Sequence, residues 1–270
     1  MRIHRVAVAA LAVLALPAPG QLGAQENPLA RLQPRGLGVS PVFEGWYRNP
    51  DGTYTLSFGY INRNTEQVLD IPVGATNRVE PGLADQGQPT HFTPRRSYGV
   101  FTVTVPADFG RDRRVTWTLE ANGERYSIPG GLLDAYETDN LHARATDRYP
   151  PVVVLEPGSA ESRGPNGARV GPVPAVVGRP LALRARAWDV QGRDVTLRWY
   201  AYRAPGAVRF DRAELPLGEG ATLATTTATF SAPGDYVLYL RADHSDVRVS
   251  AAGLEQCCWT NAYLLVEVAP

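Results

Sequence analysis

The stretch Leu223-Ala-Thr-Thr-Thr-Ala-Thr-Phe-Ser-Ala-Pro-Gly-Asp-Tyr-Val-Leu-Tyr-Leu-Arg-Ala242 decides the fold of this chain. It contains two runs with a side-chain period of two residues, separated by a Pro-Gly-Asp turn signal. This period is the pattern of a β-strand, whose successive side chains point to opposite faces of a sheet. The stretch therefore predicts two strands. The residues that share a face are Ala224, Thr226, Ala228 and Phe230 in the first strand, and Tyr236, Leu238 and Leu240 in the second.

The same alternation recurs along the chain in both directions. Asp51-Gly52 and Asn122-Gly123 lie between alternating runs and supply residues that tolerate the positive φ of a hairpin turn. No segment after residue 24 has a helical period over twelve residues. We therefore predict an all-β protein of two consecutive β-sandwich domains, the second immunoglobulin-like. The further alternating runs are 53–60, 101–105, 115–119, 181–188, 195–200 and 262–268.

The distribution of turns and prolines predicts how the chain is divided. The run 150–157 has prolines at both ends, which favours an edge strand that opens the second domain. A polar stretch rich in Pro and Gly surrounds this run, from residue 138 to residue 174. We predict a signal peptide at 1–24, an N-terminal segment at 25–39, a sandwich-like domain at 40–137, a linker at 138–149 and an immunoglobulin-like domain at 150–270.

The second predicted domain resembles an immunoglobulin-like sandwich of the PKD or bacterial Ig-like kind. In such folds a Trp on the third strand packs in the core, and a Tyr near the start of the sixth strand closes a loop through its hydroxyl. Trp199 and Tyr236 match these two places. Leu183 and Leu238 stand where antibody-type domains have bridging cysteines, so the resemblance implies no such bridge. It implies a fold and says almost nothing about function.

The first predicted domain is similar to uncharacterised exported bacterial proteins. The residues that carry this similarity are Phe43-Glu-Gly-Trp-Tyr-Arg-Asn49, Phe58-Gly-Tyr-Ile-Asn-Arg-Asn64 and Gly87-Gln-Pro-Thr-His-Phe-Thr-Pro94. No activity, ligand or site residue follows from it.

Composition excludes several classes of function. The 27 basic residues are all Arg, they balance 27 acidic residues, and they are scattered along the chain. A nucleic-acid binder or a polybasic membrane-surface protein needs a concentrated positive face, so we predict neither partner. The absence of Lys from the sequence excludes Schiff-base chemistry and a phosphate-binding P-loop lysine.

The first 24 residues have the pattern of a secretory signal peptide. Arg2 and Arg5 precede an apolar run at 6–16, and small residues follow as far as Ala24. The run is too short to cross a bilayer, which takes about 20 apolar residues. We therefore expect an exported protein, periplasmic or extracellular, with no membrane span.

The two cysteines of the sequence, Cys257 and Cys258, are neighbours. Export implies an oxidising compartment, but adjacent cysteines cannot close a long loop. We predict a vicinal disulfide that forms a rigid turn. Two reduced thiols that bind a soft metal such as Cu(I), an intermolecular bridge and two unremarkable thiols stay as alternatives.

Few residues of the sequence are candidates for chemistry. His91, Arg95 and Arg96 share a proline-bounded loop that could bind an anion or a carboxylate, and the alternative is a solvated loop. We read His244 as a turn residue, because a catalytic triad takes its members from separated loops. No catalytic residue and no cofactor are predicted. Calcium at the strand ends near Asp189, Asp194, Asp243 and Asp246 is an alternative without a motif.

Aromatic residues near strand ends, Trp46, Tyr47 and Trp188, could stack on sugars, with core packing as the alternative. From all of this we predict an exported, non-catalytic binding or structural-interaction protein, whose partner is an envelope or extracellular protein or polysaccharide. Two alternatives are kept. One is an enzyme that acts on an envelope or extracellular polymer, with its site near His91; the other is a copper-handling protein.

Overall fold

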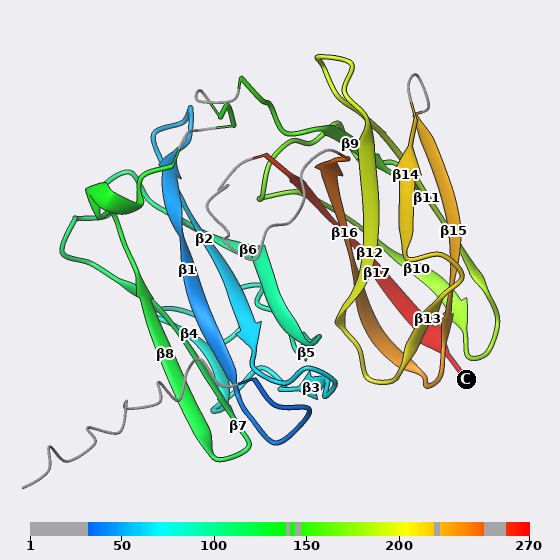
Figure 1. Ribbon diagram of the computed structural model, residues 1–270, viewed down its shortest axis with the longest axis horizontal. Coiled ribbons are helices and arrows are strands. Elements are labelled where there is room, and N and C mark those ends of the chain that lie inside the picture. The colour runs from blue at the N-terminus through cyan, green and yellow to red at the C-terminus, as the bar shows by residue number, and fades with distance from the viewer. Residues whose placement is uncertain (1–31, 139–140, 144–146, 219–221, 246–257) are drawn as a thin grey trace, which may run out of the picture. The chain divides into compact units, whose positions relative to one another are not determined.

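The computed structural model describes residues 32–138, 141–143, 147–218, 222–245 and 258–270 (Figure 1). These residues form β-strands and one short 3-10 turn, η2 (Asp134–Tyr136), which confirms the all-β prediction. Among them, no helix is long and apolar enough to cross a membrane. The expected signal peptide, 1–24, lies outside the described residues.

The strands of the N-terminal part form two three-stranded antiparallel sheets and a short ribbon. One sheet has the order β1-β2-β6 and the other β4-β7-β8, while β3 pairs with β5. We name these strands the N-terminal strand set. Their bounds are β1 (Val39–Arg48), β2 (Tyr54–Asn62), β3 (Leu69–Asp70), β4 (Asn77–Glu80), β5 (His91–Phe92), β6 (Arg95–Val105), β7 (Val115–Ala121) and β8 (Glu124–Gly130).

Aromatic packing holds the N-terminal strand set together. Phe58 of β2 stacks on Phe101 of β6 at 5.3 Å, and Trp117 of β7 meets Phe101 edge-on at 4.8 Å; none of the three is more than 1% exposed. The predicted hairpin turn is present between β7 and β8, because Asn122 and Gly123 both have a positive φ, 52° and 77°.

The strands of the C-terminal part form two facing sheets. The orders are β10-β17-β16-β12-β14 and β13-β15-β11-β9. The edge position of β9 agrees with the expectation for the proline-bounded run. We name these strands the C-terminal strand set. Their bounds are β9 (Val152–Leu155), β10 (Ala168–Val176), β11 (Leu181–Trp188), β12 (Val195–Arg203), β13 (Val208–Phe210), β14 (Glu214–Leu217), β15 (Leu223–Phe230), β16 (Gly234–His244) and β17 (Thr260–Ala269).

The two residues that carried the immunoglobulin-like resemblance have the expected roles. Trp199 of β12 is 2% exposed in the core between the two sheets. Tyr236 of β16 donates its hydroxyl proton to the carbonyl oxygen of Ala232 at 2.9 Å, which closes the turn before the strand. The C-terminal strand set is therefore an immunoglobulin-like β-sandwich. Its likeness to the PKD kind in particular stays a prediction.

Strand β10 was not expected, because its sequence falls in the polar stretch read as irregular. It pairs in parallel with β17, and a bulge between Val170 and Val173 accommodates Gly171 and Pro172. At Gly171, φ is 108° and an added Cβ would lie 2.4 Å from the carbonyl oxygen of Leu265. An edge strand tolerates prolines that cannot donate to the sheet, so the sequence pattern was ambiguous here.

The outer face of the five-stranded sheet is also covered, which the alternation did not predict. Tyr200, Tyr239 and Tyr263 are direct partners across β12, β16 and β17, and they stack with ring distances of 5.6 and 5.5 Å. Tyr239 and Tyr263 belong to the same buried cluster as Phe58 and Phe101 of the N-terminal strand set. This row of tyrosines therefore joins the two strand sets. The expected domain boundaries at 137 and 150 stay a prediction.

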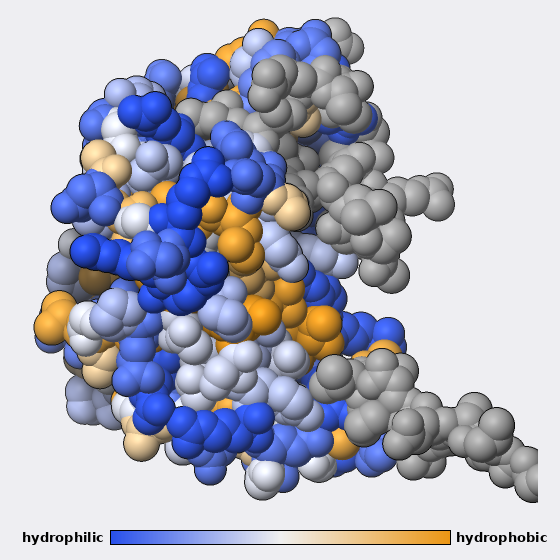
Figure 2. Space-filling model, turned by 90° about the vertical axis from the view of Figure 1, so that its left-hand side faces the viewer, coloured by the Kyte–Doolittle hydropathy of each residue, from blue (hydrophilic) through white to orange (hydrophobic). Residues whose placement is uncertain are grey.

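Figure 2 shows the side of the molecule on which β1 and β8 lie in Figure 1. Hydrophobic atoms form a patch in the middle of this face, bordered by hydrophilic ones. The segment that follows β8 has two exposed large apolar side chains: Leu133 is 40% and Tyr136 is 42% exposed. Tyr136 contacts the ring of Phe43 at 5.4 Å. The η2 segment, which packs on β1 through Tyr136, therefore also exposes apolar surface.

Candidate functional site

A cleft of about 490 Å³ lies where β6 and the segment before it meet the outer face of β12 and β16. Its volume is in the range of small-molecule sites, about 300–1,000 Å³. We refer to it as the tyrosine cleft. Its lining residues are Tyr60, Pro89, His91, Thr93, Arg96, Ser97, Tyr98, Val100, Arg198, Tyr200, Ala201, Tyr202, Tyr239, Arg241, Asp243 and Ser245.

Tyr200 is the open end of the row of stacked tyrosines. It is half-buried, whereas Tyr239 is 4% and Tyr263 is 1% exposed. The hydroxyl of Tyr239 donates to Asn261 Oδ1 at 2.8 Å, and that of Tyr263 to the carbonyl of Val100 at 2.8 Å. The Tyr200 hydroxyl makes no hydrogen bond within the described part of the chain. Burial raises the pKa of Tyr200 above its usual range, and a tyrosine hydroxyl both donates and accepts hydrogen bonds.

Arg241 and Asp243 form the polar wall of the cleft on β16. The Arg241 Nε donates to both Asp243 carboxylate oxygens at 3.0 Å, and its Nη1 donates to the carbonyl of Tyr98 at 2.6 Å. Burial alone would lower the pKa of Arg241, but the neighbouring charge of Asp243 outweighs it and the pKa is raised. Asp243 also accepts from Arg198 Nη1 at 3.4 Å. The carboxylate is therefore fixed in place.

A second buried ion pair supports the opposite wall. Arg96 Nη2 donates to Glu44 Oε1 at 2.6 Å, and the same oxygen accepts from the backbone N–H of Gly99 at 3.3 Å. Desolvation raises the pKa of Glu44, although Arg96 acts in the opposite direction. Gly59 leaves room for the pair, since a Cβ there would lie 2.1 Å from Glu44 Oε1.

The structure brings together two of the three residues that the sequence proposed as a ligand site. His91 and Arg96 both line the tyrosine cleft, whereas Arg95 is exposed and is not one of the lining residues. Asp70 of β3 is the strand partner of His91 on β5. His91 Nδ1 lies 2.7 Å from Asp70 Oδ1, and this contact orients the imidazole ring. His91 Nε2 makes no hydrogen bond within the residues described.

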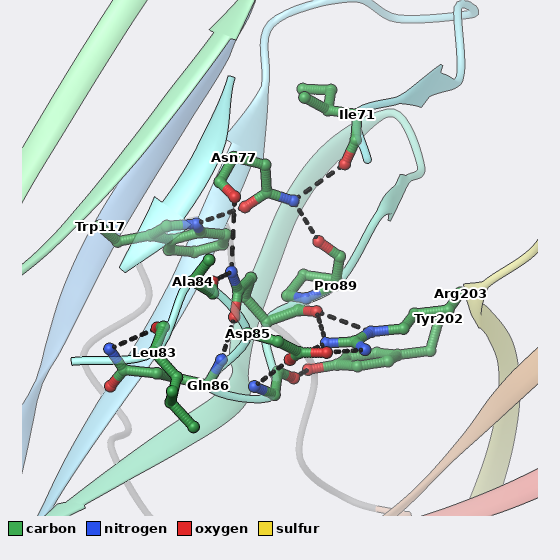
Figure 3. Close-up of polar contacts among 12 residues, drawn as sticks. Ile71, Asn77, Leu83, Ala84, Asp85, Gln86, Pro89, Trp117, Tyr202 and Arg203 are labelled. Carbon is green, nitrogen blue, oxygen red and sulfur yellow. Dashed lines mark hydrogen bonds and ion pairs between the residues drawn. The ribbon is translucent and has the colours of Figure 1, made fainter. Parts of the chain in front are cut away.

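A folded loop between β4 and β5 joins the two strand sets (Figure 3). Asn77 donates to the carbonyls of Ile71 and Pro89 at 2.9 and 2.7 Å, and accepts from Trp117 Nε1 at 3.0 Å. This network fixes the start of the segment that carries His91. Because Asn77 is fully buried, these bonds replace the ones that it would otherwise make to water.

The same loop binds the C-terminal strand set through Arg203 of β12 (Figure 3). The Arg203 guanidinium forms a bidentate pair with the Asp85 carboxylate, with both N–O distances at 2.7 Å, and it also donates to the carbonyl of Gln88. The hydrogen bonds from Arg203 lower the pKa of Asp85 to about 2. Such fork-shaped pairs fix geometry as well as adding energy.

His244, which we expected in a turn, is the last residue of β16 and is buried. Its Nε2 lies 3.1 Å from Asp189 Oδ1, and both side chains are fully buried. The other Asp189 oxygen accepts the backbone N–H groups of Gln191 and Arg193. Asp189 is thus engaged in closing its own turn.

The described residues contain no cluster of three or more His, Cys, Asp or Glu suited to a metal, and Asp246 lies outside them.

Cys258 is disulfide-bonded, and its Sγ lies 3.2 Å from the carbonyl oxygen of Arg148. Cys257, the expected partner, lies outside the described residues, so the bond between adjacent cysteines stays a prediction. The next residue, Trp259, lies with its indole over the Arg241 guanidinium at 4.5 Å.

Sequence reasoning missed most of the cleft. The aromatic residues it suggested as a sugar platform include Trp46 and Tyr47, which are only 5% and 6% exposed and pack in the core. The useful signal was present in β12 and β16, where large side chains such as Tyr200 and Tyr239 occupy the face opposite the core residues. A strand with aromatic residues on both faces is covered on both, but the pattern does not say by what.

No known protein-family model matches the chain, and no curated protein matches its sequence. Solved structures with some likeness include the D00-D0 domain of intimin, with a TM-score of 0.26, 10% identity, and coverage of 84% of this chain and 98% of that one. Activated alpha-2-macroglobulin from Escherichia coli has a TM-score of 0.29 and 10% identity, over 86% of this chain and 18% of that one. The CARDB domain of PF1109 from Pyrococcus furiosus has a TM-score of 0.26 and 14% identity, over 44% and 96%. Likeness at this level carries no argument about function.

Proposed function

We propose that this protein is an exported, non-catalytic binding protein whose ligand occupies the tyrosine cleft. The observation that carries the proposal is a concave site of ligand size in which accessible aromatic surface lies beside polar groups already fixed by hydrogen bonds. Preorganised sites bind more tightly because less side-chain freedom is lost on binding. His91 and Arg96 are the predicted ligand residues that belong to this proposal.

A variant that fills the cleft tests its role. Arg198 lies on the same face of β12 as Tyr200 and lines the cleft, so the larger side chain of Arg198→Trp should occupy the ligand space. The matched control is Arg209→Trp, because Arg209 is exposed on β13 in the other sheet. A protein that retains its thermal transition but loses its ligand only in Arg198→Trp supports the proposal. Equal binding by both variants contradicts it.

Export rests on the N-terminal sequence pattern. N-terminal sequencing of the protein recovered from the periplasm or medium should begin at Gln25, if cleavage follows Ala24. A protein that stays in the cytoplasm with Met1 or Arg2 at its terminus contradicts this part of the proposal.

The enzyme alternative is favoured by one observation, the oriented His91–Asp70 pair at the cleft. Acid–base chemistry on a polymer needs further groups that are free to exchange protons. Asp243, the carboxylate that lines the same cleft, is instead held by Arg241 and Arg198. Product analysis after long incubation with an envelope polymer tests the alternative, with His91→Gln as the control. The copper alternative requires free thiolates, whereas Cys258 is disulfide-bonded.

A further inference from the structure

We propose that the ligand of the tyrosine cleft is an uncharged sugar, bound as pyranose units of a neutral glycan. This inference rests on the proposed function and adds to it the chemical class of the ligand. Four features of the cleft carry it. They are the pairing of its charges, the open end of its aromatic row, the polar groups of its lining, and a bordering strand edge whose carbonyl groups are already hydrogen-bonded.

The charges of the cleft are compensated within the protein. Each arginine that lines it is held by a carboxylate, so an anionic ligand would compete with an existing partner. A neutral ligand does not displace these carboxylates, because it can hydrogen-bond to groups whose charges are already paired. The pairs are Arg96 with Glu44 at 2.6 Å, Arg198 with Glu214 at 3.1 Å and Arg241 with Asp243 at 3.0 Å.

The row of stacked tyrosines ends inside the cleft at Tyr200. Tyr239 covers one side of its ring at 5.6 Å, and the side chain is half-buried in a position that lines the cleft. The C–H groups on one face of a pyranose carry a small positive charge and pack on the negative face of an aromatic ring. Tyr200 thus offers a sugar both a ring and a hydroxyl that has no bond within the described residues.

Polar groups around Tyr200 suit the hydroxyls of a sugar. The Asp243 carboxylate is fixed by Arg241, and His91 Nε2 makes no hydrogen bond within the described part of the chain. A carboxylate accepts hydrogen bonds, and an imidazole nitrogen donates or accepts according to the proton it carries. Adjacent sugar hydroxyls can do both, so they match this mixture without bringing a net charge.

An extended peptide, the main alternative ligand, finds no free strand edge here. Strand β6 is the edge of its sheet and borders the cleft, so it is the natural place for a peptide to add a strand. The carbonyl groups of residues 97–100, the part of β6 that borders the cleft, are already engaged by side chains. Arg96 binds the carbonyl of Ser97, Arg241 that of Tyr98, Asn261 that of Gly99 and Tyr263 that of Val100.

Binding to defined oligomers tests the inference. The full chain is titrated by calorimetry with the neutral tetramers of glucose, xylose, mannose and N-acetylglucosamine, and with tetragalacturonate and an acidic tetrapeptide. We expect at least one neutral tetramer to bind, with an affinity that salt does not change. Tyr200→Ala should weaken it about tenfold or more and Tyr200→Phe less, because only the first removes the ring. Tyr136→Ala, an exposed tyrosine of η2, is the matched control and should bind normally.

The outcomes separate the two proposals. If none of the neutral tetramers binds, or if Tyr200→Ala binds a neutral tetramer as well as the unaltered protein does, the sugar assignment is wrong. If tetragalacturonate or the peptide binds instead and Arg198→Trp removes that binding, the assignment to neutral sugars fails while the binding role of the cleft stands. If a ligand binds and Arg198→Trp leaves its affinity unchanged, the proposed function itself is overturned.

Discussion

The indole ring of Trp259 occupies the space that a side chain at Gly99 would need. A Cβ on residue 99 would lie 2.0 Å from Trp259 Cζ2, and φ of Gly99 is +50°. Trp259 is 5% exposed and also covers the Arg241 guanidinium. The contact therefore places the residue that precedes β17, of the C-terminal strand set, against β6 of the N-terminal strand set.

Gly99→Ala should destabilise the protein by about 3 kcal/mol, the sum of an unfavourable φ and a steric overlap. Denaturant unfolding measures the change. In a Trp259→Phe background, which lacks the Cζ2 atom, the same substitution should cost clearly less. Equal costs in the two backgrounds mean that the indole does not occupy this space.

Asp85 and Arg203 should make the joint between the strand sets sensitive to acid. The pKa of Asp85 is about 2 in the folded protein, below its ordinary value of 3.8. A lowered pKa means that the stabilisation is present above about pH 4 and is lost as the pH falls through 2. Because the Asp85 side chain is 54% exposed, we expect a contribution of only about 1 kcal/mol. Unfolding measured against pH should show this loss, and Asp85→Asn should remove it.

The buried tyrosines should make the protein sensitive to alkali. Desolvation raises the pKa of Tyr263 to about 12, from 10.0 in the unfolded chain. Between these values the unfolded state releases a proton that the folded state keeps, so stability falls as the pH rises above about 10. Tyrosinate absorbance and circular dichroism should change together in a pH titration. Tyr263→Phe should flatten the slope of stability against pH, and an unchanged slope would contradict the assignment.

Asn77→Ala should cost about 3 kcal/mol, because it leaves two backbone carbonyls and the Trp117 indole N–H without partners in a buried place. Thermal or denaturant unfolding checks the value. Asn166→Ala is the matched control, since Asn166 is exposed and makes a single bond, to Thr55 at 3.2 Å. It should change stability by less than about 0.5 kcal/mol. Similar costs for the two would show that the buried network adds little.

The fold class could be predicted because alternation and turn signals are local. Asn122-Gly123 forms its hairpin turn, and Trp199 and Tyr236 take the places that the resemblance implied. The cleft could not be predicted in the same way. It depends on contacts between segments far apart in the sequence, such as Arg241 with the carbonyl of Tyr98. His91 and Arg96 could be proposed as ligand residues because they lie in one polar, proline-bounded segment of the sequence. Tyr200, by contrast, has the pattern of an ordinary strand residue.

The strand order β10-β17-β16-β12-β14 has a consequence for how the chain folds during synthesis. Strand β17, residues 260–269, lies inside the sheet and pairs with both β10 and β16. It also carries Tyr263, which anchors the N-terminal strand set through Val100. Neither the C-terminal sandwich nor its joint to the N-terminal strands can close until these residues have emerged from the ribosome. A nascent chain that has not reached them lacks an inner strand of this sheet and the tyrosine that joins the sheet to β6.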